Sequence, residues 1–301
     1  MRAVVTGGAG FVGSHVAEAL LARGDEVHVL DNLSTGSREK IPDGAELHVG
    51  DIRSDAASVF EEARPEVCFH LAAQADVNTS VAQPDFDADV NVLGTLRVLE
   101  AARGAGAKVV FTSTGGAIYG ECDGPAPETQ ERRPISPYGI SKLAGEEYLI
   151  GWNRLHGTNH VALRLANVYG PRQEASLEGG VIAIFLDRMA SDEPVRIFGN
   201  GAQTRDFIYV LDVVSAALAA VEHGGGIINV GTGIETSVNE LFEACRRVTD
   251  YEREPEHAAA RAGEILRSVI DPARAGAELG WSARRNLAEG LRETWASLAP
   301  A

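Results

Sequence analysis

The fold is decided by the stretch Ala3-Val4-Val5-Thr6-Gly7-Gly8-Ala9-Gly10-Phe11-Val12-Gly13. It begins with a short run typical of a buried strand, and an amphipathic helical pattern starts at its end. Between them, Gly7 would permit a tight turn, Gly10 would let a pyrophosphate approach the backbone, and Gly13 would let helix and strand pack closely. Glycines at this spacing also occur in ordinary turns, but their place between a strand and a helix indicates a dinucleotide-binding fold.

The second apolar run ends at Asp31, eighteen residues beyond Gly13. A carboxylate at this place can accept hydrogen bonds from both ribose hydroxyls of NAD, and it would repel the additional phosphate of NADP. The alternative is an ordinary solvated loop acid. Together with the glycines before it, Asp31 favours NAD as the cofactor.

Short apolar runs and amphipathic patterns alternate through the first half of the chain. The predicted buried strands are 3–6, 27–30, 47–49, 67–71, 108–112 and 160–165, and the predicted helices are 12–22, 90–102 and 138–155. This alternation predicts an α/β fold with a doubly wound parallel sheet, the Rossmann arrangement.

Beyond residue 167 the pattern changes to short strands at 195–198, 207–210 and 227–230, with helices at 211–221, 238–247 and 287–298. This predicts a smaller C-terminal α/β lobe at the edge of the sheet. We expect a cofactor domain of residues 1–166 plus about 205–225, and a substrate lobe of about 167–204 plus 226–301.

The composition excludes several kinds of partner. With 43 acidic against 27 basic residues, a formal net charge of −16 and no basic run, the chain is not expected to bind nucleic acid or an anionic membrane. Its three cysteines are scattered without a CxxC motif, so neither a disulfide framework nor a zinc site is indicated, and no metal is expected. Because the opening apolar run is too short for a signal peptide and no 18-residue apolar stretch follows, we expect a cytoplasmic protein without membrane spans.

The strongest chemical signal is the pair Tyr138 and Lys142. Only three lysines occur in the chain, so roughly 0.06 Tyr-Lys pairs at this spacing are expected by chance. The GxxGxxG pattern of Gly7, Gly10 and Gly13 is expected by chance roughly 0.4 times, so the Tyr-Lys pair is the more specific signal. Ser136 can cap a helix, Pro137 suits its first turn, and a spacing of four places phenol and ammonium on one face. A tyrosine that acts as a base at pH 7 needs about 4 kcal/mol, of which a cation roughly 5 Å away supplies about 3 kcal/mol. The pair is typical of a redox enzyme, in which a positively charged nicotinamide could supply the rest.

Further polar and small residues follow the other predicted strands, where strand ends line a cofactor cleft. Asp51 and Ile52 follow the third strand, residues 71–73 follow the fourth, and Thr112 and Thr114 end the fifth. Each is a weak signal by itself, because hydroxyls at a strand end are more often turn formers.

Taken in order, these residues resemble the extended short-chain dehydrogenases/reductases, the NAD-dependent epimerase/dehydratase family, over essentially the whole chain. Within that family the chain looks like the short bacterial UDP-glucose 4-epimerases. The matching stretches are 31–36 (DNLSTG), 113–120 (STGGAIYG), 165–173 (LANVYGPRQ) and 204–209 (TRDFIY).

The resemblance implies NAD as the cofactor and a UDP-sugar as the substrate. It makes Tyr138 the base, Lys142 the residue that holds the nicotinamide ribose and lowers the Tyr138 pKa, and Thr114 a hydrogen-bond partner of the sugar O4. The implied cofactor-binding residues are Gly7, Gly10, Phe11, Val12, Gly13, Asp31, Asn32, Ser34, Thr35, Gly36, Asp51, Ile52, Leu71, Ala72, Ala73, Asn91, Thr112, Tyr138 and Lys142. The implied substrate-binding residues are Thr114, Asn167, Val181, Phe198, Arg205, Arg261 and Ser268.

Asn167, Arg205 and Arg261 match the family positions that contact the sugar-nucleotide diphosphate. Guanidinium groups are natural counter-ions for a diphosphate in a chain of net charge −16, although an isolated arginine more often forms a surface ion pair. One departure concerns the cofactor pocket. Some family members place a lysine there, shortly after the turn at 70–73, but Ala75 and Asp76 stand in its place, so a less positive pocket is expected.

Helices 90–102 and 138–155 resemble the dimer interface of the family, and the resemblance therefore implies a homodimer.

The residues after Thr114 bear on the reaction. Family dehydratases carry an Asp-Glu pair and decarboxylases a Glu at this point, whereas Gly115 and Gly116 follow here. Without an acid to eliminate water, the 4-keto sugar is expected to take its hydride back on the other face, which is epimerisation at C4 of UDP-glucose or UDP-galactose. The implied steps are proton removal from O4 by Tyr138, hydride transfer from C4 to NAD, rotation of the keto sugar, and return of hydride and proton.

Several alternatives stay open. Uronic-acid epimerases carry Thr at the position of Asn167 and Arg at that of Glu174, so an acid at 174 disfavours UDP-glucuronate. A dehydratase or reductase of another nucleotide sugar, or a non-catalytic NAD-binding sensor, would share the fold. Ser268 is small where epimerases restricted to hexoses carry a bulky aromatic residue, so acceptance of UDP-N-acetylhexosamines is expected; the alternative is an ordinary strand-end serine.

Overall fold

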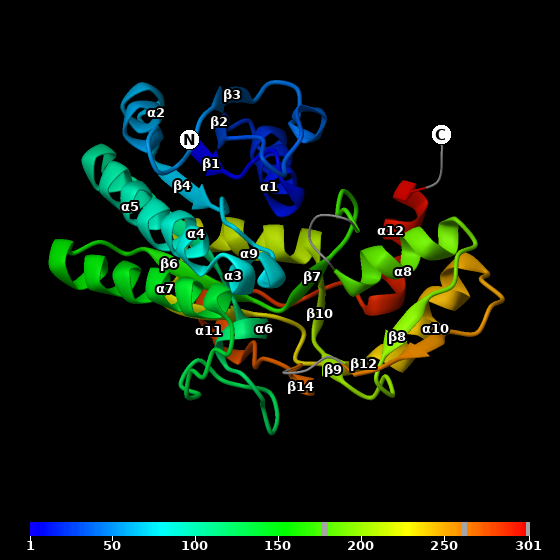
Figure 1. Cartoon of the computed structure of the whole chain (residues 1–301). Coiled ribbons are helices and arrows are strands. Elements are labelled where there is room, and N and C mark those ends of the chain that lie inside the picture. Colours follow the sequence, from blue (N-terminus) through cyan, green and yellow to red (C-terminus); the bar gives the residue numbers. More distant parts are fainter. Residues whose placement is uncertain (176–179, 261–263, 299–301) are drawn as a thin grey trace.

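The computed structural model describes residues 1–175, 180–260 and 264–298. Its centre is a seven-stranded sheet in the order β11-β6-β5-β4-β1-β2-β3, with every pairing parallel (Figure 1). The strands are β1 (Arg2–Thr6), β2 (Glu26–Asp31), β3 (Glu46–Val49), β4 (Val67–His70), β5 (Lys108–Thr114), β6 (Val161–Leu165) and β11 (Gly226–Val230). The strand order reverses between β1 and β4, the place where doubly wound sheets bind ligands at the carboxyl ends of their strands. The predicted Rossmann fold is confirmed.

Helices cover both faces of the sheet. One face packs against α2 (Ala56–Ala63), α5 (Gly94–Ala105) and α7 (Pro137–His156), and the other against α1 (Phe11–Ala22), α9 (Val210–Glu222) and α11 (Ala273–Leu279). Alternate strand residues supply the two cores, as in β1, where Val4 faces the α2 side and Val5 the α1 side. Because both faces are buried, the central strands are mostly apolar, as in β1, β4 and β6.

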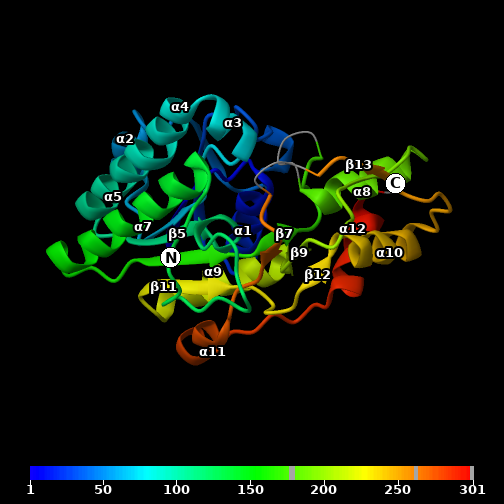
Figure 2. The ribbon, with the colours of Figure 1, turned by 60° about the horizontal axis from the view of Figure 1, so that its bottom comes forward.

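A smaller lobe stands beside the carboxyl end of the sheet (Figures 1 and 2). Its strands are β7 (Asn167–Tyr169), β8 (Arg196–Phe198), β9 (Thr204–Arg205), β10 (Phe207–Tyr209), β12 (Thr236–Ser237), β13 (Glu256–Ala258) and β14 (Arg267–Ser268). They pair as β7 with β10, β8 with β13, and β12-β9-β14. Helices α8 (Val181–Ala190), α10 (Val238–Thr249) and α12 (Leu287–Leu298) enclose its core, in which the Phe185 and Phe242 rings meet edge to face.

Most predicted elements are present with ends within a few residues of their predicted places. The predicted helix 90–102 begins instead as a π-helical turn, η2 (Asp89–Leu93), which continues into α5. The predictions omitted the short helices η1 (Arg38–Lys40), α3 (Val77–Ala82), α4 (Pro84–Ala88) and α6 (Gly115–Ile118), and also α2, α8 and α11. They also omitted the short strands β7, β9, β12, β13 and β14.

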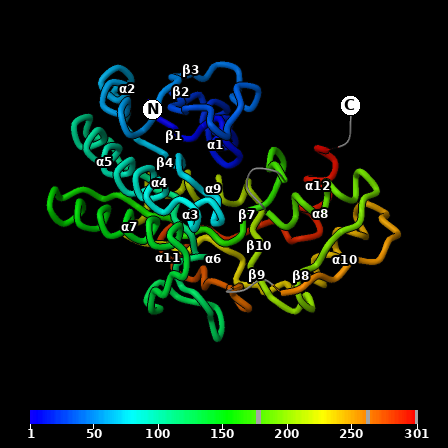
Figure 3. The backbone as a smooth tube through the Cα atoms, in the orientation of Figure 1, coloured from blue at the N-terminus to red at the C-terminus, as the bar shows by residue number. Residues whose placement is uncertain are grey.

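One boundary needs correction. Residues 226–230, expected in the smaller lobe, form the edge strand β11 and pair with β6 in the register Gly226↔Val161 to Val230↔Leu165. An unpaired edge of β6 would expose its backbone hydrogen-bonding groups, and β11 satisfies them. The rest of the expected division into two lobes stays a prediction. The backbone trace in Figure 3 shows the chain passing between the sheet and the smaller lobe more than once.

The three cysteines, Cys68, Cys122 and Cys245, are buried and unpaired. In the described part of the chain, no helix has both the length and the apolar composition required to cross a membrane.

Candidate active site

The glycine-rich turn between β1 and α1 is shaped for a phosphate. Gly7 has φ +72°, and a Cβ atom there would lie 2.6 Å from the Ala72 nitrogen; a Cβ on Gly13 would lie 2.1 Å from the Gly7 carbonyl oxygen. The helix that follows has Gly10 at its N-cap, with neither a capping side chain nor an acid in its first turn. Its first backbone N–H groups are therefore available to an anion, and the residues present fit the pyrophosphate of a dinucleotide.

Asp31, at the end of β2, is held against this turn. Its carboxylate accepts hydrogen bonds from the backbone N–H groups of Ala9 (2.9 Å) and Leu33 (2.8 Å), and the residue is 8% exposed. The loop that follows returns to the same place, because Ser37 N–H donates to the Ala9 carbonyl. The fixed negative charge thus stands beside the phosphate turn.

We expect the chain to bind NAD at least about tenfold more tightly than NADP, because Asp31 would repel a 2′-phosphate. Isothermal titration of both cofactors measures this preference. Asp31→Asn should reduce the difference between the NAD and NADP affinities, mainly by strengthening NADP binding. Asp43→Asn, on the exposed loop that follows, is the control and should leave this difference unchanged. Equal affinity of the unmodified protein for both cofactors would contradict this role of Asp31.

Asp51 is oriented by two side chains. It accepts hydrogen bonds from Arg53 Nε (2.9 Å) and Nη2 (2.8 Å) and from Asn32 Nδ2 (3.1 Å). The Arg53 guanidinium, which also contacts Asp89, holds the pKa of the Asp51 carboxyl far below its usual range. Asp51 is therefore an ionised acceptor at this edge of the sheet.

The helix α7 begins as the sequence predicts. Ser136 Oγ caps it by accepting from the Gly139 N–H (3.2 Å), and Pro137 lies in its first turn. Tyr138 is half-buried, whereas Lys142 is 3% exposed and its Nζ lies 4.6 Å from the centre of the Phe111 ring. Burial lowers the pKa of Lys142 to about 8, so most of its positive charge is retained at pH 7.

Thr114 ends β5 beside two glycines of α6. A Cβ atom on Gly116 would lie 3.9 Å from Thr114 Oγ1 and 3.4 Å from Asn167 Oδ1, so these two polar atoms border one space. A Cβ on Gly115 would lie 2.8 Å from the Ile270 side chain. A side chain at 115 would therefore require Ile270 to shift, and the glycine suits the close packing of α6 against Ile270.

His70, at the end of β4, holds the turn that follows it. Hydrogen bonds link its Nδ1 to Thr6 Oγ1 (2.7 Å) and its Nε2 to Thr95 Oγ1 (3.0 Å). The Thr95 hydroxyl donates to the Asn91 carbonyl, and Thr6 Oγ1 accepts from the Ala72 N–H. One assignment of donors and acceptors satisfies all of these hydrogen bonds: Thr6 donates to His70, and His70 Nε2–H donates to Thr95. Burial lowers the pKa of His70 to about 3, so His70 is neutral and positions the turn instead of moving protons.

A buried ion pair joins α7 to the sheet, and sequence reasoning missed it. Arg164 of β6 donates to both carboxylate oxygens of Glu146, from Nε (2.9 Å) and Nη2 (2.6 Å), and each side chain is 1% exposed. Ser113 Oγ donates to Glu146 (2.6 Å), and Arg164 Nη1 donates to the Tyr119 hydroxyl (2.7 Å). Since Ser113 precedes Thr114 and Glu146 follows Lys142 by one turn, this network holds the strand and the helix of the predicted catalytic residues together.

The expected substrate residues come together in part. Ser268 of β14 pairs with Arg205 of β9, and the Asn167 N–H on β7 donates to the Asp206 carbonyl (2.8 Å). Arg205 Nη2 lies 3.6 Å from a Glu264 oxygen, and burial lowers the pKa of Arg205. Val181, at the start of α8, and Phe198, at the end of β8, are half-buried. Arg261 lies outside the described residues.

Polar contacts join the loop after β7 to α1 and to the loop after β2. Lys40 Nζ lies 2.5 Å from Glu174 Oε1, Arg172 Nη2 lies 2.6 Å from Glu18 Oε2, and His15 Nε2 bonds to the Pro171 carbonyl at 2.9 Å. The charge of Glu174 is therefore balanced by a lysine from the loop after β2. This contact weakens the expectation that Glu174 repels an acidic sugar.

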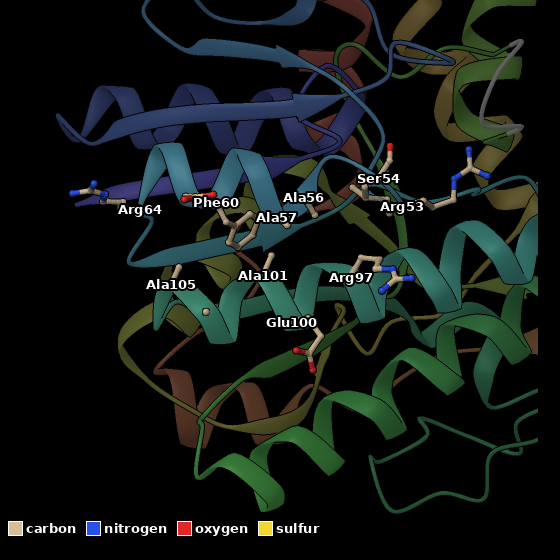
Figure 4. Close-up of a pocket in the computed structure, with 13 residues that line it drawn as sticks. Arg53, Ser54, Ala56, Ala57, Phe60, Arg64, Arg97, Glu100, Ala101 and Ala105 are labelled. Atoms are coloured by element: carbon tan, nitrogen blue, oxygen red, sulfur yellow. The ribbon is translucent and has the colours of Figure 1, made fainter.

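A surface groove of about 670 Å³ lies between α2 and α5, as the close-up in Figure 4 shows. Its labelled lining includes Phe60, Ala101 and the arginines Arg64 and Arg97. It is lined by neither the glycine-rich turn nor the Tyr138 helix, so it is separate from the candidate active site.

Among the described residues, one cluster of side chains is close enough together to ligate a metal ion. It consists of His28, Glu46 and His48, whose ligand atoms lie within 4.8 Å of one another. His28 Nδ1 and His48 Nε2 are 3.1 Å apart and form a hydrogen bond between the imidazoles. The group lies on β2 and β3, and the carboxylates of Glu26 and Glu62 flank its outer nitrogens. The hydrogen bond satisfies the two facing nitrogens without an ion.

The comparisons with known proteins agree with this geometry. The model of the "NAD dependent epimerase/dehydratase family" matches residues 3–231. The chain belongs to this family. A UDP-glucose 4-epimerase from Thermotoga maritima, solved with UDP-glucose, is 45% identical with a TM-score of 0.97, covering 99% of this chain and 98% of that one.

Two further solved structures of the family are informative. A UDP-glucose 4-epimerase from Thermus thermophilus in complex with NAD is 44% identical, with a TM-score of 0.93 and coverage of 99% and 98%. A UDP-N-acetylglucosamine 4-epimerase from Methanobrevibacter ruminantium, in complex with UDP-N-acetylmuramic acid, is 33% identical, with a TM-score of 0.93 and coverage of 98% and 97%. Family membership and the shape of the glycine-rich turn together identify NAD as the cofactor.

Proposed function

We propose that the chain interconverts UDP-glucose and UDP-galactose by epimerisation at C4. Two observations support this proposal: Tyr138 and Lys142 lie one turn apart on α7, and Gly115, packed against the Ile270 side chain, follows Thr114 where an acid would serve elimination. The UDP-glucose 4-epimerases among the solved relatives share nearly the full length of the chain.

In this proposal, Tyr138 accepts the proton of the sugar O4–H and later returns it, and Thr114 orients that oxygen. Lys142 stabilises the phenolate of Tyr138 by its positive charge. NAD, when bound, supplies the acceptor and donor of the C4 hydride. Arg205 and Asn167 hold the diphosphate while the keto sugar turns to present its other face. Because Gly115 and Gly116, and not acids, follow Thr114, water is retained and the sugar leaves as the C4 epimer.

Incubation of the NAD-loaded protein with UDP-glucose, followed by ¹H NMR of the anomeric region, tests the proposal. Signals of UDP-galactose should grow to a constant ratio, and the same ratio should be reached from UDP-galactose. Signals of a 4-keto-6-deoxy sugar would indicate a dehydratase. Bound NAD without turnover of UDP-glucose, UDP-N-acetylglucosamine or UDP-glucuronate would indicate a sensor.

The sugar pocket is expected to accept 2-acetamido sugars because Ser268 is small. Ser268→Tyr should lower kcat/KM for UDP-N-acetylglucosamine by about a hundredfold or more and for UDP-glucose much less, since steric exclusion acts on the larger sugar. Ser268→Ala, which keeps the space open, should leave the ratio of the two substrates nearly unchanged. Because Ser268 is 3% exposed, the thermal midpoint of each variant is measured as well. Equal losses for both sugars would show that residue 268 does not select the substrate.

We also propose a homodimer formed by the two helices expected for it, η2 with α5 and α7, together with α3 and α4, which pack against α7. These helices carry large apolar side chains that are 41% to 73% exposed: Val77, Val81, Phe86, Ile140, Tyr148 and Leu155. An apolar surface spread over neighbouring helices is typical of a subunit interface. Light scattering should give twice the chain mass, and Ile140→Glu should reduce it.

The three unpaired cysteines suit the reducing cytoplasm that we propose as the location.

A further inference from the structure

Asp87 is a buried carboxylate that the proposed reaction does not yet use. It lies on α4 and is 1% exposed. Its Oδ1 accepts hydrogen bonds from Gln74 Nε2 (2.9 Å) and Asn91 Nδ2 (3.1 Å). Its Oδ2 is fully buried and has no hydrogen-bond partner within residues 1–175, 180–260 and 264–298. A buried charged oxygen without a partner is strongly unfavourable unless an opposite charge stands nearby.

Lys142 is a buried cation on the neighbouring helix, and its ammonium lies against the face of the Phe111 ring. Helix α4 packs against α7, and the two ribbons lie side by side in Figures 1 and 2. Asn91 connects them, because its Nδ2 is within hydrogen-bonding distance of both Asp87 Oδ1 and Ser141 Oγ (3.1 Å), the residue before Lys142. The carboxylate and the ammonium therefore share one buried region between the two helices.

The other charged groups that act on Lys142 are already balanced or neutral. Glu146 on α7 is bound through both oxygens to Arg164 of β6. His70 on β4 is neutral because burial lowers its pKa to about 3. Tyr138 on α7 is the group that the charge of Lys142 is proposed to serve. Asp87, by contrast, is a buried carboxylate that forms no ion pair with an arginine or lysine among the described residues, and its Oδ2 has no hydrogen-bond partner there.

We propose that Asp87 is the counter-ion of Lys142: it keeps the ammonium charged inside the protein and so acts as a positioning residue for Tyr138. The link to Tyr138 rests on the proposed function, whereas the pairing of Asp87 with Lys142 does not. The sign of the effect follows from the charges. Burial lowers the pKa of Lys142 to about 8, and the negative charges of Asp87 and then Glu146 oppose that shift. Removal of the Asp87 charge should therefore lower the Lys142 pKa further.

The charge of Lys142 can be measured directly, because only three lysines occur in the chain. Protein labelled with [¹³Cε]lysine gives three lysine signals, which Lys40→Arg and Lys108→Arg assign. The Lys142 signal is then titrated in the unmodified protein, in Asp87→Asn and in Asp85→Asn. Asp85 is the matched control: it lies on the same helix, loses the same charge, and is exposed.

Asp87→Asn should lower the Lys142 pKa by about one pH unit, and Asp85→Asn should change it by less than about 0.2. Equal effects of the two substitutions would overturn the proposal. If Asp87→Asn does not fold, Asp87→Ser, which is smaller and also uncharged, carries the same expectation. This measurement requires no turnover, so it is independent of the epimerase assignment.

Activity provides the second readout. In Asp87→Asn the alkaline limb of the kcat profile should move to lower pH by the same amount as the Lys142 titration, because Tyr138 loses its cation there. A merely structural role would reduce kcat at all pH values alike, and that result would overturn the positioning role of Asp87.

Discussion

Replacement of Tyr138 by Phe is expected to lower kcat for UDP-glucose by about a thousandfold or more. The substitution removes the hydroxyl that we propose takes the O4 proton, and general acid–base catalysis of this kind contributes about 10²–10⁴ in rate. Because Tyr138 is half-buried and the ring is retained, the thermal midpoint and the affinity for NAD should change little. Steady-state kinetics, calorimetric melting and NAD titration of the same preparation test these expectations.

Tyr148→Phe is the control for this experiment. Tyr148 lies on the same helix and is 41% exposed, so loss of its hydroxyl should leave kcat unchanged. A Tyr138→Phe enzyme that kept more than about a tenth of its rate would exclude Tyr138 as the base.

Of the substitutions considered, Glu146→Ala is expected to lower the free energy of unfolding most, by about 3–5 kcal/mol. It leaves the Arg164 guanidinium charged and buried, and removes the acceptor of the Ser113 hydroxyl. Urea denaturation measures the loss. Glu147→Ala is the matched control: Glu147 is 58% exposed and pairs with Arg132 at the surface, so its loss should stay within about 1 kcal/mol. Similar losses for both variants would mean that the buried pair does not hold α7 to the sheet.

The sequence predicted those parts of the site whose signals are local. The strand, turn and helix around Gly7 follow each other within a dozen residues, and the cap, Pro137, Tyr138 and Lys142 occupy a single helix start. In each case the spacing along the chain determines which side chains share a face or a turn.

Contacts between distant segments could not be predicted in the same way. Glu146 with Arg164, Asp87 near Lys142, and Lys40 with Glu174 are pairs that only the packed structure brings together. Charged residues such as these are common in a polar sequence, and no periodicity distinguishes the buried ones. The same reason explains the wrong boundary at 226, because a short apolar run does not say which sheet it joins.

The place of β11 has a consequence for how the chain folds. β6 ends at Leu165, but the strand that covers its open edge begins at Gly226, after much of the smaller lobe has been made. At about 5–20 residues per second, a ribosome needs roughly 3–12 s to add the intervening segment. During that time an apolar parallel edge is open to pairing with other nascent chains. The long separation of these contacts also predicts slow refolding, with an aggregation-prone intermediate that lacks β11.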